Sequence, residues 1–123
     1  MVEHLVDTNV LSRFFAGDQP IRQFLGGIEI GINTVIYIER IQGSIKKKER
    51  EFIKKHLSKL GYYTLTPEIS AKSIELIDIY SSSQGLFLPD SLIAATAIVN
   101  DLTLVTFNTK DFIFIKGLRV VKP

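Results

Sequence analysis

Four acidic residues occupy positions at which an α/β protein could bring them together. Asp7 directly follows the apolar run EHLV, Asp111 follows the β-branched run LTLVTF by four residues, and Asp90 precedes the Ala-rich segment SLIAATA. Glu39 is different because it lies inside the apolar stretch VIYIERIQG. A free carboxylate in such a stretch is costly unless something compensates its charge.

If these carboxylates meet in the fold, they must take up protons or hold a cation. Two unit charges about 4 Å apart repel by roughly 4 kcal/mol at an effective dielectric of 20. Ligands that are all oxygen favour a hard ion such as Mg²⁺ or Mn²⁺. That ion could lower the pKa of a bound water and stabilise the leaving oxygen of a phosphodiester. The acids together therefore indicate nuclease chemistry.

Each acid also has a simpler structural interpretation. Asp7 and Asp90 could cap the helices that follow them, and Asp111 could be a solvated residue of a polar turn. Glu39 could pair with Arg40 or lean outward into water. These explanations are independent of one another, and they do not account for four acids at one edge of the predicted sheet. We therefore favour a shared site.

The apolar pattern predicts strands that alternate with helices. Strands are expected at 3–6, 28–33, 62–66, 102–107 and 118–122. Helices are expected near 8–16, 20–26, 34–43, 46–59, 68–81 and 91–100. This order predicts one three-layer α/β/α domain over residues 1–123, with a mostly parallel sheet of about five strands. Ligands bind such sheets at the carboxyl ends of the strands.

Several helix boundaries have a local cause. Thr66, Pro67 and Glu68 supply an N-cap, a first-turn proline and a first-turn acid. Glycines are expected where helices end, at Gly43, Gly61 and Gly85. The helix that follows Pro67 is expected to bury one apolar stripe, made of Ile69, Ile74, Ile77 and Tyr80.

The composition is that of an ordinary globular protein. Hydrophobic residues make up 46% of the 123 residues and charged residues 23%, which excludes a disordered chain. There is no cysteine, no apolar run long enough to cross a membrane, and an acid where a signal peptide would be basic. We therefore expect a cytoplasmic protein. The net charge of +2 is too small to indicate a nucleic-acid binder by itself.

The motifs together resemble the PIN domains, and in particular the small PIN ribonuclease toxins of type II toxin–antitoxin pairs, the VapC-like proteins. LVDTNVL resembles the opening strand of that family with its first acid, and INTVIYIERIQG resembles the helix with its second. LPDSLIAATA and LTLVTFNTKDF resemble the segments that bear the third and fourth acids. IKGLRVVKP is similar to the closing strand, so the resemblance spans nearly the whole chain.

The resemblance implies endonucleolytic cleavage of RNA that depends on Mg²⁺ or Mn²⁺, a homodimer, and inhibition by a cognate antitoxin. It makes Asp7 and Asp90 the main metal ligands, and Glu39 and Asp111 the pair that completes the site and positions water. Family members often carry an acid where this chain has Asn108. Either Asp111 supplies that charge or the second metal site is weak, and Asn108 can still bind metal or orient water through its carbonyl oxygen. The residues expected to support the acids are Thr8, Asn9, Thr106 and Asn108.

The stretch IKKKEREFIKKHLSKL (45–60) predicts an amphipathic helix. Its apolar stripe is expected to comprise Ile45, Phe52, Ile53, Leu57 and Leu60. Its other faces carry lysines that are either solvated or bind RNA phosphates, namely Lys46, Lys47, Lys48, Lys54 and Lys55, with Lys59 beyond them. By resemblance, antitoxins bind at this helix and the one before it. His4 and His56 lack a ligand-like spacing and are expected to be structural or exposed.

Two other functions compete with the nuclease. A catalytically silent PIN domain would only bind RNA or a protein partner, although the presence of all four acids argues against it. A phosphoacceptor signalling domain also uses acids at the carboxyl edge of a parallel sheet, but it needs an acidic pair near the first strand. Here only Asp7 ends that strand, and Glu3 lies at its other end.

Overall fold

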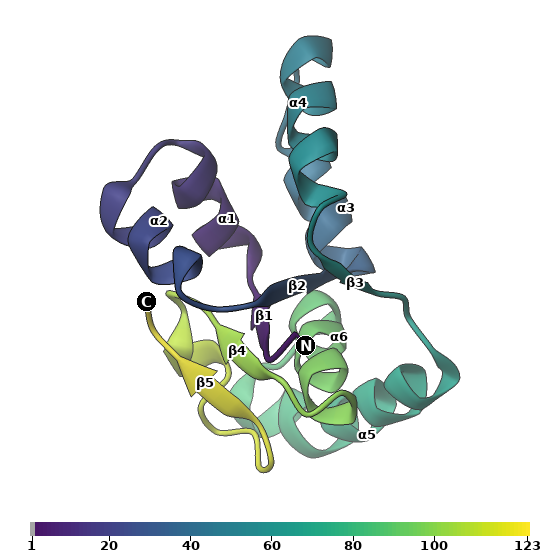
Figure 1. The fold of residues 1–123 in the computed structure, drawn as a ribbon. Helices are drawn as coiled ribbons and strands as arrows, with labels where there is room; N and C mark the ends of the chain where they lie inside the picture. The colour runs from purple at the N-terminus through teal and green to yellow at the C-terminus, as the bar shows by residue number, and fades with distance from the viewer. Residues whose placement is uncertain (1) are drawn as a thin grey trace.

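Five short strands form one parallel sheet in the order β3-β2-β1-β4-β5 (Figure 1). The computed structural model describes residues 2–123. The strands are β1 (His4–Val6), β2 (Ile30–Asn33), β3 (Gly61–Tyr63), β4 (Thr103–Val105) and β5 (Arg119–Val121). Leu5 pairs with Gly31 on one side and with Leu104 on the other. The strand order reverses between β1 and β4, which is where open α/β sheets bind ligands.

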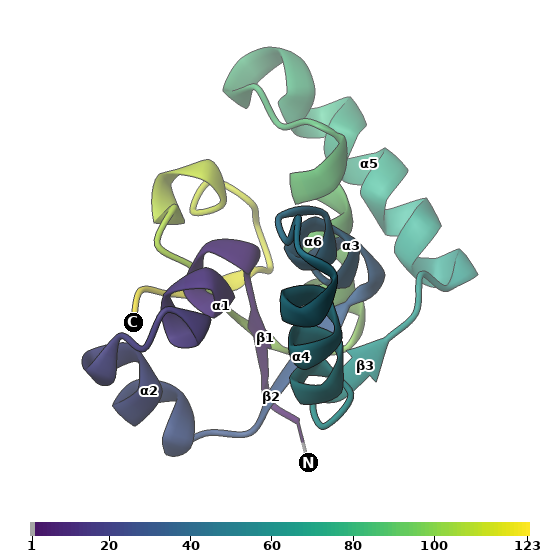
Figure 2. The same ribbon diagram turned by 90° about the horizontal axis from the view of Figure 1, so that it is seen from above.

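Helices cover both faces of this sheet, as the alternating pattern predicts. They are α1 (Thr8–Phe15), α2 (Gln19–Gly26), α3 (Thr34–Gln42), α4 (Lys47–Leu57), α5 (Pro67–Gln84) and α6 (Leu88–Val99). Seen from above, α1 and α2 lie on one side of β1, and α5 and α6 lie on the other (Figure 2). Helices α3 and α4 form an arm that rises from the sheet (Figure 1). The predicted three-layer fold with five parallel strands is confirmed.

The core lies on both faces of the central strands, against α6 on one face and α1 on the other (Figure 2). Strands β1 and β4 are covered on both faces, so their side chains Leu5, Val6, Leu104 and Val105 are fully buried. Helix α6 buries Ile93 together with a row of alanines, and small side chains let a helix approach its neighbours closely. Within residues 2–123, every helix is too short or too polar to span a lipid bilayer.

The local signals for helix ends hold at most positions. Thr66 caps α5 by accepting a hydrogen bond from the amide of Ile69 at 3.2 Å. Gly43 and Gly85 follow α3 and α5, and Gly85 has a left-handed φ of 74°.

The prediction for Gly61 is wrong, because α4 already ends at Leu57 and Gly61 begins β3. Gly61 pairs with Gly31 of β2, and a Cβ at Gly61 would lie 2.5 Å from Val2 Cγ2. The glycine therefore permits close packing at this strand pair.

Two predicted apolar stripes are partly wrong. In α5, Ile69 is buried but Ile74 is 66% exposed, because the face turned to α6 is completed by Ser73 and Leu76 instead. Ser73 contributes to this contact through a buried hydrogen bond of 2.8 Å with Ser91 of α6.

The α4 stripe also differs from the prediction. Ile53 and Leu57 are buried, whereas Phe52 is 55% exposed and Ile45 is 92% exposed. Ile45 precedes α4, which begins at Lys47, so it does not share the buried face of the helix.

Candidate active site

Asp7 lies at the centre of the carboxyl edge of the sheet, directly after β1, and is only 7% exposed. One of its carboxylate oxygens, Oδ1, accepts a hydrogen bond from the amide of Thr8 at 2.8 Å and caps α1. The other, Oδ2, accepts a hydrogen bond from the Thr106 hydroxyl, also at 2.8 Å. Capping is therefore one role of Asp7, and it does not explain the contact with Thr106.

Thr106 follows β4, is fully buried, and connects three segments. Besides donating to Asp7, its hydroxyl oxygen accepts hydrogen bonds from the amide of Asn108 at 3.1 Å and from Asn9 Nδ2 at 3.5 Å. Asn9 Oδ1 in turn accepts from the amide of Phe107 at 3.4 Å. These contacts hold the segment after β4 against the start of α1.

Glu39 reaches the same edge from α3. Its Oε1 accepts a hydrogen bond from the hydroxyl of Thr8 at 2.8 Å, so Thr8 contacts one acid through its side chain and another through its amide. Arg40 does not neutralise Glu39. Its guanidinium donates to Ser44 Oγ at 3.0 Å and lies over the ring of Phe15, with Cζ 5.3 Å from the ring centroid.

Asp90 is the third residue of α6, which begins at Leu88, three residues earlier than predicted. Phe87 is the N-cap residue and makes no side-chain capping bond. The capping interpretation of Asp90 is therefore wrong. The carbonyl oxygen of Leu88 accepts a hydrogen bond from the Ser91 hydroxyl at 2.7 Å, and Asp90 is partly buried.

The fourth acid is presented by a short 3₁₀ turn, Thr109–Asp111. Both Asn108 and Asp111 are exposed. The amide of Asp111 donates to the carbonyl of Asn108 at 3.0 Å, so one tight turn carries both residues.

The pKa values of Asp7 and Asp90 respond to the other carboxylates at this edge. The pKa of Asp90 is raised to about 6. Burial is the largest cause, and the negative charges of Asp7, Asp111 and Glu39 contribute the rest of the rise. Burial also raises the pKa of Asp7, and the charges of Glu39 and Asp111 act in the same direction. The hydrogen bonds that Asp7 accepts oppose this rise. The acids thus lie within electrostatic range of one another.

No basic side chain compensates these charges within the described part of the chain. The ion pairs there join Arg13 to Asp18, Lys72 to Glu75 and Arg119 to Asp101, all elsewhere. Among residues 2–123, no three His, Cys, Asp or Glu side chains are already close enough to enclose a metal ion. The four carboxylates, which the pKa values of Asp7 and Asp90 relate to one another, do not close on a common point, and we call them the acidic cluster.

One positioning contact lies outside the residues that the sequence motifs suggest. Asn33 ends β2, is fully buried, and caps α3 by accepting from the amide of Ile36 at 2.9 Å. Its Nδ2 donates to the hydroxyl of Thr96 in α6 at 3.0 Å. Asn33 therefore ties the helix that carries Glu39 to the helix that carries Asp90. An Asn between a strand and a helix is a capping signal that the sequence does contain.

The predicted lysines do not join the acidic cluster. Lys46, Lys47, Lys48, Lys54 and Lys55 are all exposed at or on α4, in the arm that rises from the sheet. Whether they contact RNA is a separate question from the chemistry at the sheet edge.

Comparison with known proteins identifies the family. The family model described as PIN domain matches residues 4–116. The chain belongs to the PIN domain family. A curated relative, Ribonuclease VapC1 from Rickettsia felis, is 26% identical over 125 residues, which cover 95% of this chain and 93% of that protein.

Solved structures have the same PIN fold. A toxin–antitoxin complex from Klebsiella pneumoniae contains a chain with 32% identity and a TM-score of 0.83, and the match covers 97% of this chain and 96% of that one. A chain of VapBC2 from Rickettsia felis, bound to a DNA fragment from its promoter, has a TM-score of 0.84 at 24% identity, over 100% of this chain and 99% of that one.

Proposed function

We propose that this PIN domain is a metal-dependent endoribonuclease and the toxin of a toxin–antitoxin pair. The observation that carries the proposal is the acidic cluster at the strand-order switch, where the pKa values of Asp7 and Asp90 are raised by burial and by neighbouring carboxylates, and where no ion pair with a basic side chain is found among residues 2–123. The names of two similar proteins, a ribonuclease and a toxin–antitoxin complex, support it.

The acidic cluster suits a hard divalent cation. Its donors are all carboxylate oxygens, and a cation would offset the repulsion that raises the pKa of Asp7 and Asp90. An open cluster is adequate because Mg²⁺ commonly binds one or two carboxylates, keeps several waters and contacts a substrate phosphate. When bound, Mg²⁺ or Mn²⁺ would lower the pKa of a water and stabilise charge on the phosphodiester.

We assign Asp7 and Asp90 as the residues that hold the ion, and Glu39 and Asp111 as those that complete the site and orient water. Thr8 and Thr106 support this assignment by occupying one oxygen each of Asp7, which limits rotation of that carboxylate. The Thr8 hydroxyl orients Glu39 in the same way. Asn9 and Asn108 support Thr106, and Asn108 remains an alternative to Asp111 as the final oxygen donor.

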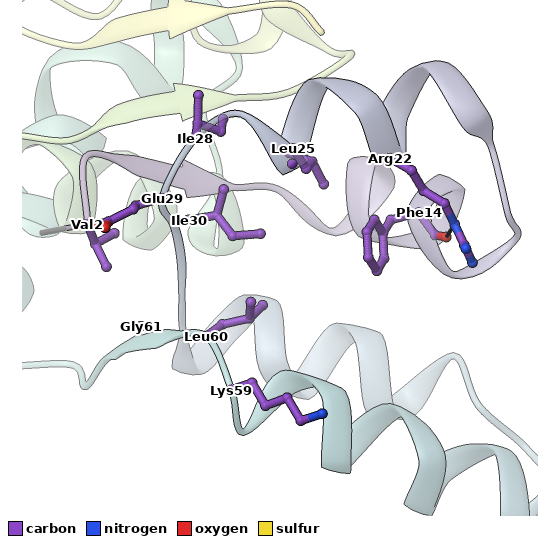
Figure 3. A pocket seen from close by; sticks show the side chains of 11 residues that line it. Val2, Phe14, Arg22, Leu25, Ile28, Glu29, Ile30, Lys59, Leu60 and Gly61 are labelled. Atoms are coloured by element: carbon purple, nitrogen blue, oxygen red, sulfur yellow. Dashed lines mark hydrogen bonds between the residues drawn. The ribbon is translucent and has the colours of Figure 1, made fainter.

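The antitoxin is proposed to bind an apolar groove between α1, α2 and α4. A cavity of about 460 Å³ is lined mainly by apolar side chains, with Arg22 and Lys59 among its polar residues (Figure 3). A second cavity of about 190 Å³ shares Phe14, Ile30, Lys59 and Leu60 with the first. The two cavities are therefore adjacent, and their mainly apolar linings suit the apolar face of a partner segment.

We also propose a homodimer in the cytoplasm. A second copy would cover part of the apolar surface that the single chain leaves exposed, where Ile74 and Leu88 are each 66% exposed. Light scattering after size-exclusion chromatography tests this, and a monomer at all concentrations would contradict it.

Cleavage of RNA tests the central proposal. Purified protein is incubated with total RNA in Mg²⁺, in Mn²⁺ and in EDTA, beside Asp7→Asn and Asp90→Asn variants. Asp78→Asn is a matched control because Asp78 is exposed on α5 and its charge is not among those that raise the pKa of Asp7 or Asp90. We expect cleavage with metal by the parent and by the control only. Equal cleavage by all variants would indicate a contaminating nuclease, and RNA binding without cleavage would favour the silent PIN domain.

A further inference from the structure

A small cavity between α3 and α4 combines positive charge with an apolar floor. Its volume is about 280 Å³, near the lower end of the range for small-molecule sites. It is lined by Tyr37, Ile38, Ile41, Gln42, Arg50 and Lys54. The lining contains two cations and no carboxylate, whereas the cavity beside Arg40 includes Glu49.

The two cations are placed for an anionic ligand. Arg50 donates to the carbonyl oxygen of Ser44 through Nη2 at 2.9 Å and Nε at 3.2 Å, so its guanidinium is held in one orientation. Lys54 lies one turn further along the same face of α4. Within residues 2–123, neither cation takes part in an ion pair, and both charges stay available to a phosphate.

The apolar floor suits a nucleobase. Tyr37 packs edge-on against Tyr62, with ring centroids 6.1 Å apart, which holds its ring in place. Ile38 is 52% exposed and Ile41 is partly buried beside it on α3. Single-stranded nucleic acids are commonly bound by a positively charged rim that follows the backbone and by aromatic side chains that contact the bases.

The cavity and the acidic cluster both include residues of α3. Ile38 and Glu39 are consecutive residues of α3, and one residue advances a helix by about 1.5 Å along its axis. Consecutive residues project about 100° apart around a helix, so the cavity, which Glu39 does not line, opens on a different face of α3 from the Glu39 side chain.

We infer that this cavity is a subsite for one nucleotide of single-stranded RNA, on a different face of α3 from the acidic cluster. The phosphate contacts Arg50 and Lys54, and the base contacts the floor formed by Tyr37 and Ile41. The inference rests on the proposed ribonuclease function and refines it. Of the five lysines that the sequence offers as RNA ligands, Lys54 is the one that lines this cavity.

Binding of a short, fluorescein-labelled, single-stranded RNA in EDTA tests the subsite without requiring catalysis. We compare the parent with Lys54→Gln and with Lys55→Gln, which removes the same charge from the next residue of α4 but does not line the cavity. We expect Lys54→Gln to weaken binding by about threefold to tenfold and to lower the slope of log K against log salt by about 0.7, as for one lost contact to a single strand. Lys55→Gln should change binding less than twofold.

A second variant tests the floor. Tyr37→Leu keeps an apolar side chain but removes the ring, and a lost base contact with an aromatic side chain weakens binding by about fivefold or more. Melting curves of each variant identify any loss of folding.

Equal losses for Lys54→Gln and Lys55→Gln, or no RNA binding by the parent in EDTA, would overturn the subsite. A change in oligomeric state for Lys54→Gln with unchanged RNA affinity would assign the cavity to a protein contact and also overturn it. Cleavage in Mg²⁺ is measured on the same proteins. If the parent cleaves RNA but Lys54→Gln and Lys55→Gln lose binding equally, the subsite alone is refuted. If Lys54→Gln loses binding selectively but the parent never cleaves RNA, the proposed catalysis alone is refuted.

Discussion

Replacing Asp90 with Asn should stabilise the metal-free protein at neutral pH. Asp90 is partly buried, and its pKa of about 6 shows that its charged form is unfavourable in the fold. Burial is the largest cause, and the charges of Asp7, Asp111 and Glu39 add to it. Asn has nearly the same shape and removes the charge, so it removes this cost.

The magnitude follows from the pKa. A rise from 3.8 to about 6 is about 2 units, and each unit corresponds to about 1.4 kcal/mol. The unscreened cost is therefore about 3 kcal/mol, which we reduce to about 1 to 1.5 kcal/mol because solvent screens a partly exposed group. For a domain of 123 residues, that gain in the free energy of unfolding raises Tm by roughly 4 to 6 °C.

The pH dependence has a definite sign. The folded-state pKa of Asp90 lies above the unfolded value, so the folded state binds the proton more tightly. The cost is present in full above about pH 6, and it disappears as the pH falls through 6 toward 4. The difference between Asp90→Asn and the parent should therefore be large at pH 7.5 and small near pH 4. The raised pKa of Asp7 acts in the same direction and persists in the variant.

Thermal unfolding in EDTA, followed by circular dichroism at both pH values, measures this difference. Asp78→Asn serves as the exposed control on α5 and should match the parent. With Mg²⁺ at about 100 times its Kd, the parent should gain roughly 2.7 kcal/mol, and the variant less. An Asp90→Asn protein that melts below the parent at pH 7.5, or a difference that is equal at both pH values, would refute the electrostatic reasoning.

Three further substitutions follow from single contacts. Thr106→Val removes the hydroxyl that orients Asp7 and should lower kcat for RNA about 10- to 100-fold with little change in KM, which steady-state cleavage assays measure. Asn33→Ser keeps a capping oxygen for α3 but loses the hydrogen bond to Thr96, and it should lower the free energy of unfolding, measured in urea, by about 1 kcal/mol or more. Adding Thr96→Val to this variant should then lower the free energy of unfolding little further. Full additivity of the two losses would show that the side chains act separately. Gly31→Ala should destabilise the protein by about 1 to 3 kcal/mol in urea unfolding, because the new Cβ would lie 3.0 Å from Tyr63 Cε2 and from Val2 Cγ1. Gly26→Ala is the control: a Cβ there would meet no atom within 4 Å, so the urea midpoint should stay unchanged or rise.

Local patterns predicted most of the secondary structure. β-branched runs marked the strands and apolar periodicity marked the helices, because both depend on residues that are close in the chain. The errors arose where a distant segment decided the outcome. Gly61 resembles a helix terminator but lies in β3 opposite Gly31, and Ile74 fits the apolar stripe of α5 but is left exposed because Ser73 bonds to Ser91 across the helix pair.

The candidate site shows the same division. Asp7, Asp90 and Asp111 were recognisable from their places after a strand or near a helix start, and Glu39 from its place inside an apolar helix, but the surroundings of the four acids were not. The sequence allowed Asp90 to be a cap and Glu39 to pair with Arg40, and the fold permits neither arrangement. The sequence also could not distinguish among the lysines of α4 as RNA ligands. Only the packing of α3 against α4 places Lys54 at a cavity beside Arg50.

By itself the sequence determined the order and type of the elements, and it placed an acid at each of four points where such a protein can hold one. Tertiary structure decided which of these residues share an environment. Because β1 and β4 are neighbours in the sheet, the Thr106 hydroxyl meets Asp7, although 99 positions separate them in the chain. Repulsion and desolvation depend on such distances in space, so the raised pKa values of Asp7 and Asp90 exist only in the folded protein.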